Sequence, residues 1–234
     1  MIATIALAQP VLSQATTRLR SVDLVGPSGR LEAVVNEGAC DAPFAALVCH
    51  PHPLGGGNLH NKVVYHAMKV LSDSRWGFCW PVLRFNFRGA GTSEGLHDGE
   101  AEAGDVLAAL EWLQIEYQRP IVLAGFSFGA AMAIAACCDR DQSTAIHALV
   151  ALGLPIENGD RVYRYPSLAD LHVPKLFISG DHDQFAPAYR LTQTVANAAD
   201  PKKLALIQGS DHFFTGHLTA MQNRFAAWLK EHTQ

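Results

Sequence analysis

The sequence of 234 residues lacks any long apolar run, any basic segment and any internal repeat. Its apolar stretches are far shorter than the roughly 20 residues that a membrane-spanning helix requires. The 18 Lys and Arg residues are scattered and the formal net charge is −4, so the charge pattern favours neither nucleic acid nor a membrane as a partner. The 49 % of apolar residues, against 17 % charged, is enough for a substantial core and argues against global disorder.

The cysteines are few, and their spacing resembles neither a disulfide framework nor a zinc site. Their number is odd, and two of them are adjacent in the chain: the five are Cys40, Cys49, Cys79, Cys137 and Cys138. We expect reduced thiols in a reducing compartment.

The N-terminus, residues 1–17, is apolar at first but lacks the charged start of a secretory signal. No Lys or Arg precedes Arg18, and the apolar run ends at Gln9 and Pro10. We therefore expect an N-terminal arm and a cytoplasmic location.

Strand-like and helix-like segments alternate along the rest of the chain. Two alternating segments around Gly26-Pro27-Ser28-Gly29 predict an antiparallel hairpin over residues 18–36. Further strands are expected at 44–49, 82–87, 121–124, 148–152, 175–179 and 204–207, and helices at 60–71, 100–117, 128–138, 187–198 and 216–230. This order predicts one α/β domain over residues 18–234, with a mostly parallel sheet, helices on both faces and an N-terminal antiparallel hairpin. Ligands of such sheets bind beyond the carboxyl ends of the strands.

The most informative loop is Gly125-Phe126-Ser127-Phe128-Gly129. Four apolar residues precede it and a helix of small residues follows, an arrangement typical of a nucleophilic serine on a sharp strand-to-helix turn. The glycines allow close approach of the backbone, and the N–H of Phe128 at the start of the helix can stabilise an oxyanion. The alternative is a Gly-Ser turn that only caps a helix.

A second loop, residues 49–57, contains His50-Pro51-His52-Pro53-Leu54 and then three glycines. A second oxyanion donor is expected here. Because proline has no N–H, the candidates are His52 and Leu54, with His52 preferred. The His50-x-His52 pair also resembles the start of some metal-dependent amidohydrolases, but those enzymes need eight βα units, for which the chain is too short.

Two later loops supply an acid and a base. Asp183 lies in Ser179-Gly180-Asp181-His182-Asp183, and His212 follows the last strand. We expect His212 to act as the general base and Asp183 to orient it, with Asp181 as the reserve candidate. His182 and His217 are poorer candidates because of their positions.

Together these motifs resemble the α/β-hydrolase superfamily over nearly the whole chain. The chain is similar in particular to a small bacterial group of hydrolases without a large lid. The motifs of that group stand here as His-Pro-His-Pro at 50–53, Arg-Phe-Asn-Phe-Arg-Gly at 84–89 and Gly-Phe-Ser-Phe-Gly, the turn that carries the nucleophile, at 125–129. The order Ser127, Asp183, His212 is that of the superfamily. The connection between residues 152 and 175 is too short for a large helical cap. We expect Arg88 to brace its loop rather than clamp an anionic substrate.

The resemblance implies a serine hydrolase that acts through an acyl-enzyme, but it does not settle the substrate. Because the short connection between residues 152 and 175 leaves little for a mobile lid, we expect carboxylic esters of small soluble molecules as substrates. This interpretation implies no cofactor. From the charge pattern and the chain length we expect no nucleic-acid or membrane partner and no metal, and the oligomeric state stays open. A peptidase or thioesterase would use the same three residues. A non-catalytic binding protein with this fold is a further alternative, although such proteins usually lose members of the triad.

Overall fold

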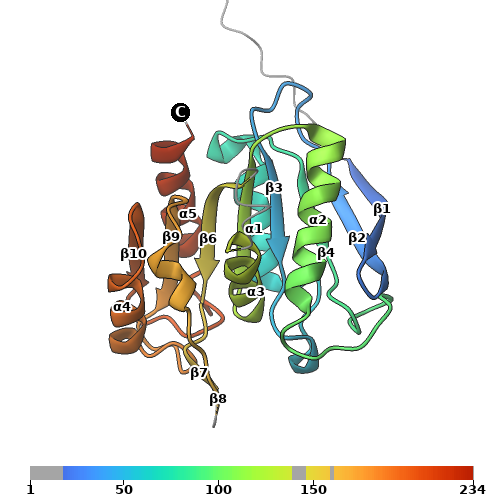
Figure 1. Ribbon diagram of the computed structural model, residues 1–234. Helices are drawn as coiled ribbons and strands as arrows, with labels where there is room; N and C mark the ends of the chain where they lie inside the picture. The colour runs from blue at the N-terminus through green and yellow to red at the C-terminus, as the bar shows by residue number, and fades with distance from the viewer. Residues whose placement is uncertain (1–17, 139–145, 159–160, 234) are drawn as a thin grey trace, which may run out of the picture.

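An eight-stranded sheet forms the centre of the molecule, and helices cover both of its faces (Figure 1). The computed structural model describes residues 18–138, 146–158 and 161–233, so the expected N-terminal arm, residues 1–17, lies outside the described residues. The strand order is β1-β2-β4-β3-β5-β6-β9-β10. Helices α2, α3 and α4 pack on one face, while α1 and α5 pack on the other.

The bounds of the elements follow the predicted alternation closely. The strands of the central sheet are β1 (Leu19–Gly26), β2 (Gly29–Asn36), β3 (Ala45–Cys49), β4 (Val82–Phe85), β5 (Ile121–Phe126), β6 (Ile146–Leu152), β9 (Lys175–Gly180) and β10 (Lys202–Ile207). The helices are α1 (Lys62–Ser72), α2 (Glu102–Tyr117), α3 (Phe128–Cys137), α4 (Ala188–Ala196) and α5 (Leu218–His232). Asn61 caps α1 by accepting the N–H groups of Val63 and Val64, so this helix begins at Lys62 and not at His60.

The predicted antiparallel hairpin is confirmed. Strands β1 and β2 pair from Leu19 with Asn36 to Gly26 with Gly29, which leaves two residues in the turn. Strand β2 also pairs antiparallel with β4, whereas the remaining neighbours in the sheet are parallel. The carboxyl ends of the parallel strands therefore meet at one edge of the sheet, and the loops that carry polar residues lie together there.

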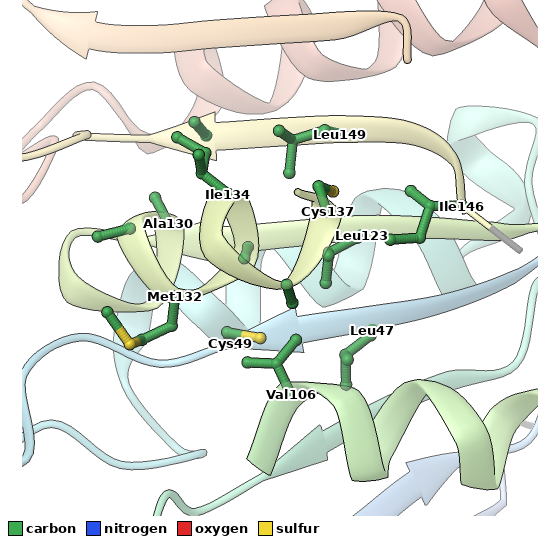
Figure 2. Packing of buried hydrophobic residues seen from close by; sticks show 14 of the residues in the cluster. Leu47, Cys49, Val106, Leu123, Ala130, Met132, Ile134, Cys137, Ile146 and Leu149 are labelled. Atoms are coloured by element: carbon green, nitrogen blue, oxygen red, sulfur yellow. The ribbon is translucent and has the colours of Figure 1, made fainter. Parts of the chain in front are cut away.

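Strands β3, β4, β5 and β9 are buried along their whole length, in keeping with the continuous apolar sequences of β3 and β5. Helix α3 is almost entirely buried as well, and its small side chains let it lie close to the sheet. Figure 2 shows Ile134 and Cys137 of this helix between the helix backbone and Leu123 and Leu149 of the strands. The close fit of α3 fixes the position of its first residue, next to Ser127.

In its described residues, 153–158 and 161–174, the connection from β6 to β9 contains no large cap. It forms the short strands β7 (Glu157–Asn158) and β8 (Arg161–Val162), which pair antiparallel, and a 3-10 helix, η3 (Pro166–Ala169). Within the described ranges, none of the helices is both long and apolar enough to cross a membrane.

Candidate active site

Ser127 stands between the end of β5 and the start of α3, on a strained turn. Its φ of 55° lies in the left-handed region, which a residue with a Cβ seldom adopts. Its N–H donates to the carbonyl of Leu152 at 2.8 Å, which ties the turn to the neighbouring strand. The turn lifts the side chain of Ser127 above the carboxyl edge of the sheet, as a nucleophile elbow requires.

The two glycines that flank the serine are required by close packing. A Cβ on Gly125 would lie 2.3 Å from the carbonyl oxygen of Gly129, and one on Gly129 would lie 2.4 Å from that of His50. Both contacts are with backbone atoms that cannot move independently. Gly129 therefore allows the first turn of α3 to contact the backbone at the end of β3, which brings the 49–57 loop beside Ser127.

His212 joins the serine to an aspartate. Its Nε2 lies 2.9 Å from Oγ of Ser127, and its Nδ1 lies 2.9 and 2.8 Å from Oδ1 and Oδ2 of Asp183. The side chains of His212 and Asp183 are almost completely buried, 2 % and 0 % exposed. The carboxylate thus fixes which ring nitrogen carries a proton: Nδ1–H donates to Asp183, and Nε2 can accept the proton of the serine.

Asp183 is held by three further donors. The hydroxyl of Ser179 donates to Oδ2 at 2.9 Å, and the N–H groups of Phe185 and Ala186 donate to Oδ1 at 2.9 and 3.1 Å. These hydrogen bonds offset the cost of burying the carboxylate. This supporting role of Ser179 was not predicted, although a hydroxyl in the fully buried strand β9 could have indicated a hydrogen bond to a nearby polar group.

The other candidates in these loops lie elsewhere. Asp181 accepts the N–H of Gly209 at 2.7 Å and so joins two loops instead of meeting His212. The imidazole of His182 is 73 % exposed. His217 precedes α5, and its Nδ1 contacts the carbonyl of Thr215. We expected His217 inside that helix; it lies just before the first helical residue.

The candidate oxyanion donors lie on two facing segments. Phe128 is the first residue of α3, where a helix has no internal acceptor for its N–H. The rings of His52 and Phe128 lie 5.0 Å apart, so the 49–57 loop faces the start of α3. Leu54 lies in a 3-10 helix, η1 (Pro53–Gly55), and is 81 % exposed.

His50 is fully buried and both of its ring nitrogens contact the backbone. Its Nδ1 lies 2.6 Å from the carbonyl of Pro51, and its Nε2 accepts the N–H of Phe87 at 2.9 Å. Burial lowers the pKa of His50 to about 4, so the ring is neutral near pH 7. With both nitrogens engaged in this way, His50 anchors its loop to the segment after β4 and does not offer a lone pair to a metal in an His50-x-His52 pair.

A cavity of about 370 Å³ opens above Ser127 and His212. Besides these two residues it is lined by Pro51, His52, Leu54, Gly55, Gly56, Gly57, Asn61, Phe128, Pro155, Asn158, Tyr163, Phe185 and Phe213. Leu54, Phe128 and Phe213 supply apolar parts of this lining. The wall that includes Pro155, Asn158 and Tyr163 was not predicted, because only the fold brings the 153–174 connection over the site.

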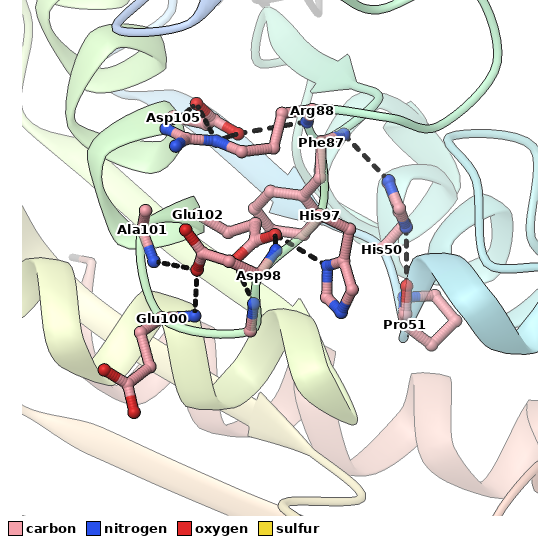
Figure 3. A network of polar contacts seen from close by, with 11 residues as sticks. His50, Pro51, Phe87, Arg88, His97, Asp98, Glu100, Ala101, Glu102 and Asp105 are labelled. Atoms are coloured by element: carbon pink, nitrogen blue, oxygen red, sulfur yellow. Dashed lines mark hydrogen bonds and ion pairs between the residues drawn. The ribbon is translucent and has the colours of Figure 1, made fainter. Parts of the chain in front are cut away.

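Arg88 has the bracing role that the sequence favoured. Its guanidinium makes a buried pair with Asp105 of α2, with hydrogen bonds of 2.7 to 3.2 Å (Figure 3). Asp105 raises the pKa of Arg88 through these hydrogen bonds. Because the side chain of Arg88 is 7 % exposed and turned toward α2, it is not available as an anion clamp in the cavity.

The sequence matches one family model and an uncharacterized bacterial protein. A family model described as "Alpha/beta hydrolase domain" matches residues 81–228. An uncharacterized protein from Rickettsia prowazekii is 38 % identical over 198 residues, which cover 81 % of this chain and 79 % of that protein.

Solved structures with similar folds include two bacterial serine hydrolase structures. One is an α/β serine hydrolase without a lid from Xanthomonas campestris, with a TM-score of 0.75, 27 % identity and coverage of 92 % of this chain and 95 % of that one. The other is an α/β serine hydrolase homologue from Coxiella burnetii, with a TM-score of 0.77, 30 % identity and coverage of 90 % and 97 %.

Proposed function

The chain belongs to the α/β-hydrolase family, and we propose that it is a serine hydrolase that cleaves carboxylic esters of small soluble molecules through an acyl-enzyme. One observation carries this proposal. Ser127, His212 and Asp183 form a continuous hydrogen-bonded chain, of which Ser127 and His212 line the cavity, although they come from three separate loops.

In the proposed reaction, Oγ of Ser127 attacks the ester carbonyl while its proton passes to Nε2 of His212. Asp183 holds the imidazole and stabilises the imidazolium that forms. The C–O bond of the tetrahedral intermediate breaks, and His212 delivers the proton to the departing alcohol. Water then adds to the acyl group by the same route, with His212 again as the base, and releases the carboxylic acid.

The negative oxygen of each tetrahedral intermediate is assigned to the N–H of Phe128 and to a second N–H in the 49–57 loop, that of His52 in preference to Leu54. The dipole of α3 adds to this stabilisation because its positive end faces the site. Removing one such donor typically lowers kcat by about 10²–10³-fold.

The cavity supports a small and uncharged acyl or alcohol group. Its described lining contains aromatic and aliphatic side chains, two asparagines and two histidines, but neither Lys, Arg, Asp nor Glu. A volume of about 370 Å³ suits a short substrate. For longer chains, each methylene outside the cavity forgoes the roughly 0.8 kcal/mol that its burial would contribute. We also propose a cytoplasmic location, in keeping with five cysteines in the free thiol form.

The first experiment treats the protein with a fluorophosphonate and maps the labelled peptide, which should contain Ser127. The second measures kcat/KM for p-nitrophenyl esters from acetyl to palmitoyl, for acyl thioesters and for aminoacyl anilides. We expect the highest values for short-chain oxygen esters. A preference for thioesters or anilides would reassign the substrate class, and a chain with neither labelling nor hydrolysis would be a binding protein.

A further inference from the structure

The segment between β4 and α2 carries a buried histidine that takes no part in the proposed proton transfer. The side chain of His97 is 8 % exposed, and its Nδ1 lies 2.6 Å from Oε1 of Glu102, whose side chain is completely buried (Figure 3). The two atoms are close, although their alignment does not meet the geometry of a hydrogen bond. This is a second imidazole–carboxylate pair, separate from His212 and Asp183.

Glu102 also holds the backbone that follows His97. Its two oxygens accept the N–H groups of Asp98 and Gly99, each at 3.0 Å. Glu102 lies in the first turn of α2, where the helix dipole favours a negative charge. The carboxylate therefore fixes both the ring of His97 and the turn on which this residue stands.

The ring of His97 packs against the two residues that flank the candidate oxyanion hole. It makes an edge contact with His52, with ring centroids 4.6 Å apart, and another with Phe128 at 5.4 Å. The rings of His52 and Phe128 lie 5.0 Å from each other. The three rings thus form a closed triangle, with His97 as the member that is anchored to α2.

We propose that His97 is a positioning residue for the oxyanion hole, which deepens the proposed function and depends on it. His97 sets the distance between the His52 loop and the start of α3, and Glu102 holds His97 in place. The spacing matters because oxyanion donors act only when they stand about 3 Å from the developing charge, and a displacement of about 1 Å can cost roughly 10²-fold in rate. Closely packed rings transmit such a displacement because the interior has little free volume.

The test uses His97→Ala, with Leu96→Ala as the matched control, since the neighbouring Leu96 is 85 % exposed. For p-nitrophenyl acetate we expect kcat of His97→Ala to fall roughly tenfold, with KM changed less than about twofold. The inhibition constant of a trifluoromethyl ketone, whose adduct places an oxyanion in the same hole, should rise by the same factor. His97→Phe should recover part of the loss, to about the threefold reduction expected without the Glu102 contact, because it keeps the edge contacts, and Leu96→Ala should match the wild type.

Glu102→Gln provides a second arm in case His97→Ala does not fold, as judged by circular dichroism and urea unfolding. It should lower kcat and ketone affinity together by about threefold, because the amide cannot hold the imidazole as a carboxylate does. Unchanged kcat in the folded variants, or a loss of kcat without a parallel loss of ketone affinity, would overturn the positioning role. If the wild type itself is neither labelled by the fluorophosphonate nor active on esters, both the proposed function and this inference are wrong.

Discussion

The two sides of Ser127 are built on different principles. On the acid–base side, the contacts run from side chain to side chain, and each of the two partners, His212 and Asp183, has one task. On the oxyanion side the proposed hydrogen-bond donors are backbone N–H groups, and several buried side chains together fix their positions. A single substitution should therefore abolish activity on the first side and reduce it by degrees on the second.

The support on the oxyanion side is spread over the segment that begins in β4. Arg84 donates to the carbonyl of Leu59 at 3.0 Å, and Asn86 accepts the N–H of the same residue at 2.7 Å. Phe87 donates to His50 at 2.9 Å. Three positions of the 84–89 segment thus hold His50, at the start of the 49–57 loop, and Leu59, two residues after its end.

The largest effect is expected for the nucleophile. Ser127→Ala should lower kcat by at least ~10⁴-fold while the far-ultraviolet circular dichroism stays unchanged, because the nucleophile and its base act as a unit. Ester hydrolysis measured with the purified variant checks this. A variant that kept more than a tenth of the wild-type activity would remove Ser127 from the mechanism.

The next effect compares two aspartates of one loop. Asp183→Asn should lower kcat by roughly 10³-fold or more, because an amide can donate to the imidazole and stabilise the wrong tautomer. Asp181→Asn should stay within about threefold of the wild type, since its side chain accepts the N–H of Gly209 and lies 4.0 Å from the exposed ring of His182. The comparison requires that both variants are folded, which their thermal unfolding curves check. A greater loss in Asp181→Asn would mean that the wrong carboxylate had been chosen.

A smaller loss is expected where the two sides meet. In Gly129→Ala the new Cβ would lie 2.4 Å from the carbonyl oxygen of His50, so α3 and the 49–57 loop must move apart. We expect kcat to fall about 10²-fold, as for a misplacement of about 1 Å. The control is Gly104→Ala in α2, where the nearest atom, 3.1 Å away, belongs to the side chain of Pro27. Equal activity in the two variants would show that the close approach at Gly129 is dispensable.

The smallest effect concerns stability on the oxyanion side. The pKa of His50 is about 4 in the folded chain against an ordinary value of about 6.5, so the unfolded chain binds more protons between these values. The contribution of neutral His50 to the free energy of unfolding is therefore fully present above about pH 6.5. It is lost as the pH falls toward 4, by at most roughly 1.4 kcal/mol per pH unit. Urea unfolding at pH 7 and pH 4.5 measures it. His50→Asn should show a smaller difference between the two pH values, and an equal difference would exclude His50 as the cause.

Much of this molecule could be predicted from local patterns. Continuous apolar runs such as the one in β5, and turn residues such as Pro27 and Ser28, determine strands, helices and the N-terminal hairpin through short-range physics. The elbow was readable for the same reason, since the strand, the glycines and the small-residue helix are contiguous in sequence. Boundaries shifted by one or two residues where a side-chain cap, as at Asn61, decided the helix start.

The tertiary structure decided which distant groups meet. His212 lies 85 positions from Ser127 and 29 from Asp183 in the sequence. Their loops meet at one edge only because β5, β9 and β10 run parallel in the same sheet. The sequence favoured Asp183 over Asp181, but the anchoring of His50 and the contacts of His97 were beyond the reach of sequence patterns. Each depends on a side-chain direction and on a hydrogen-bond partner far away in the chain, and the folded packing alone fixes both.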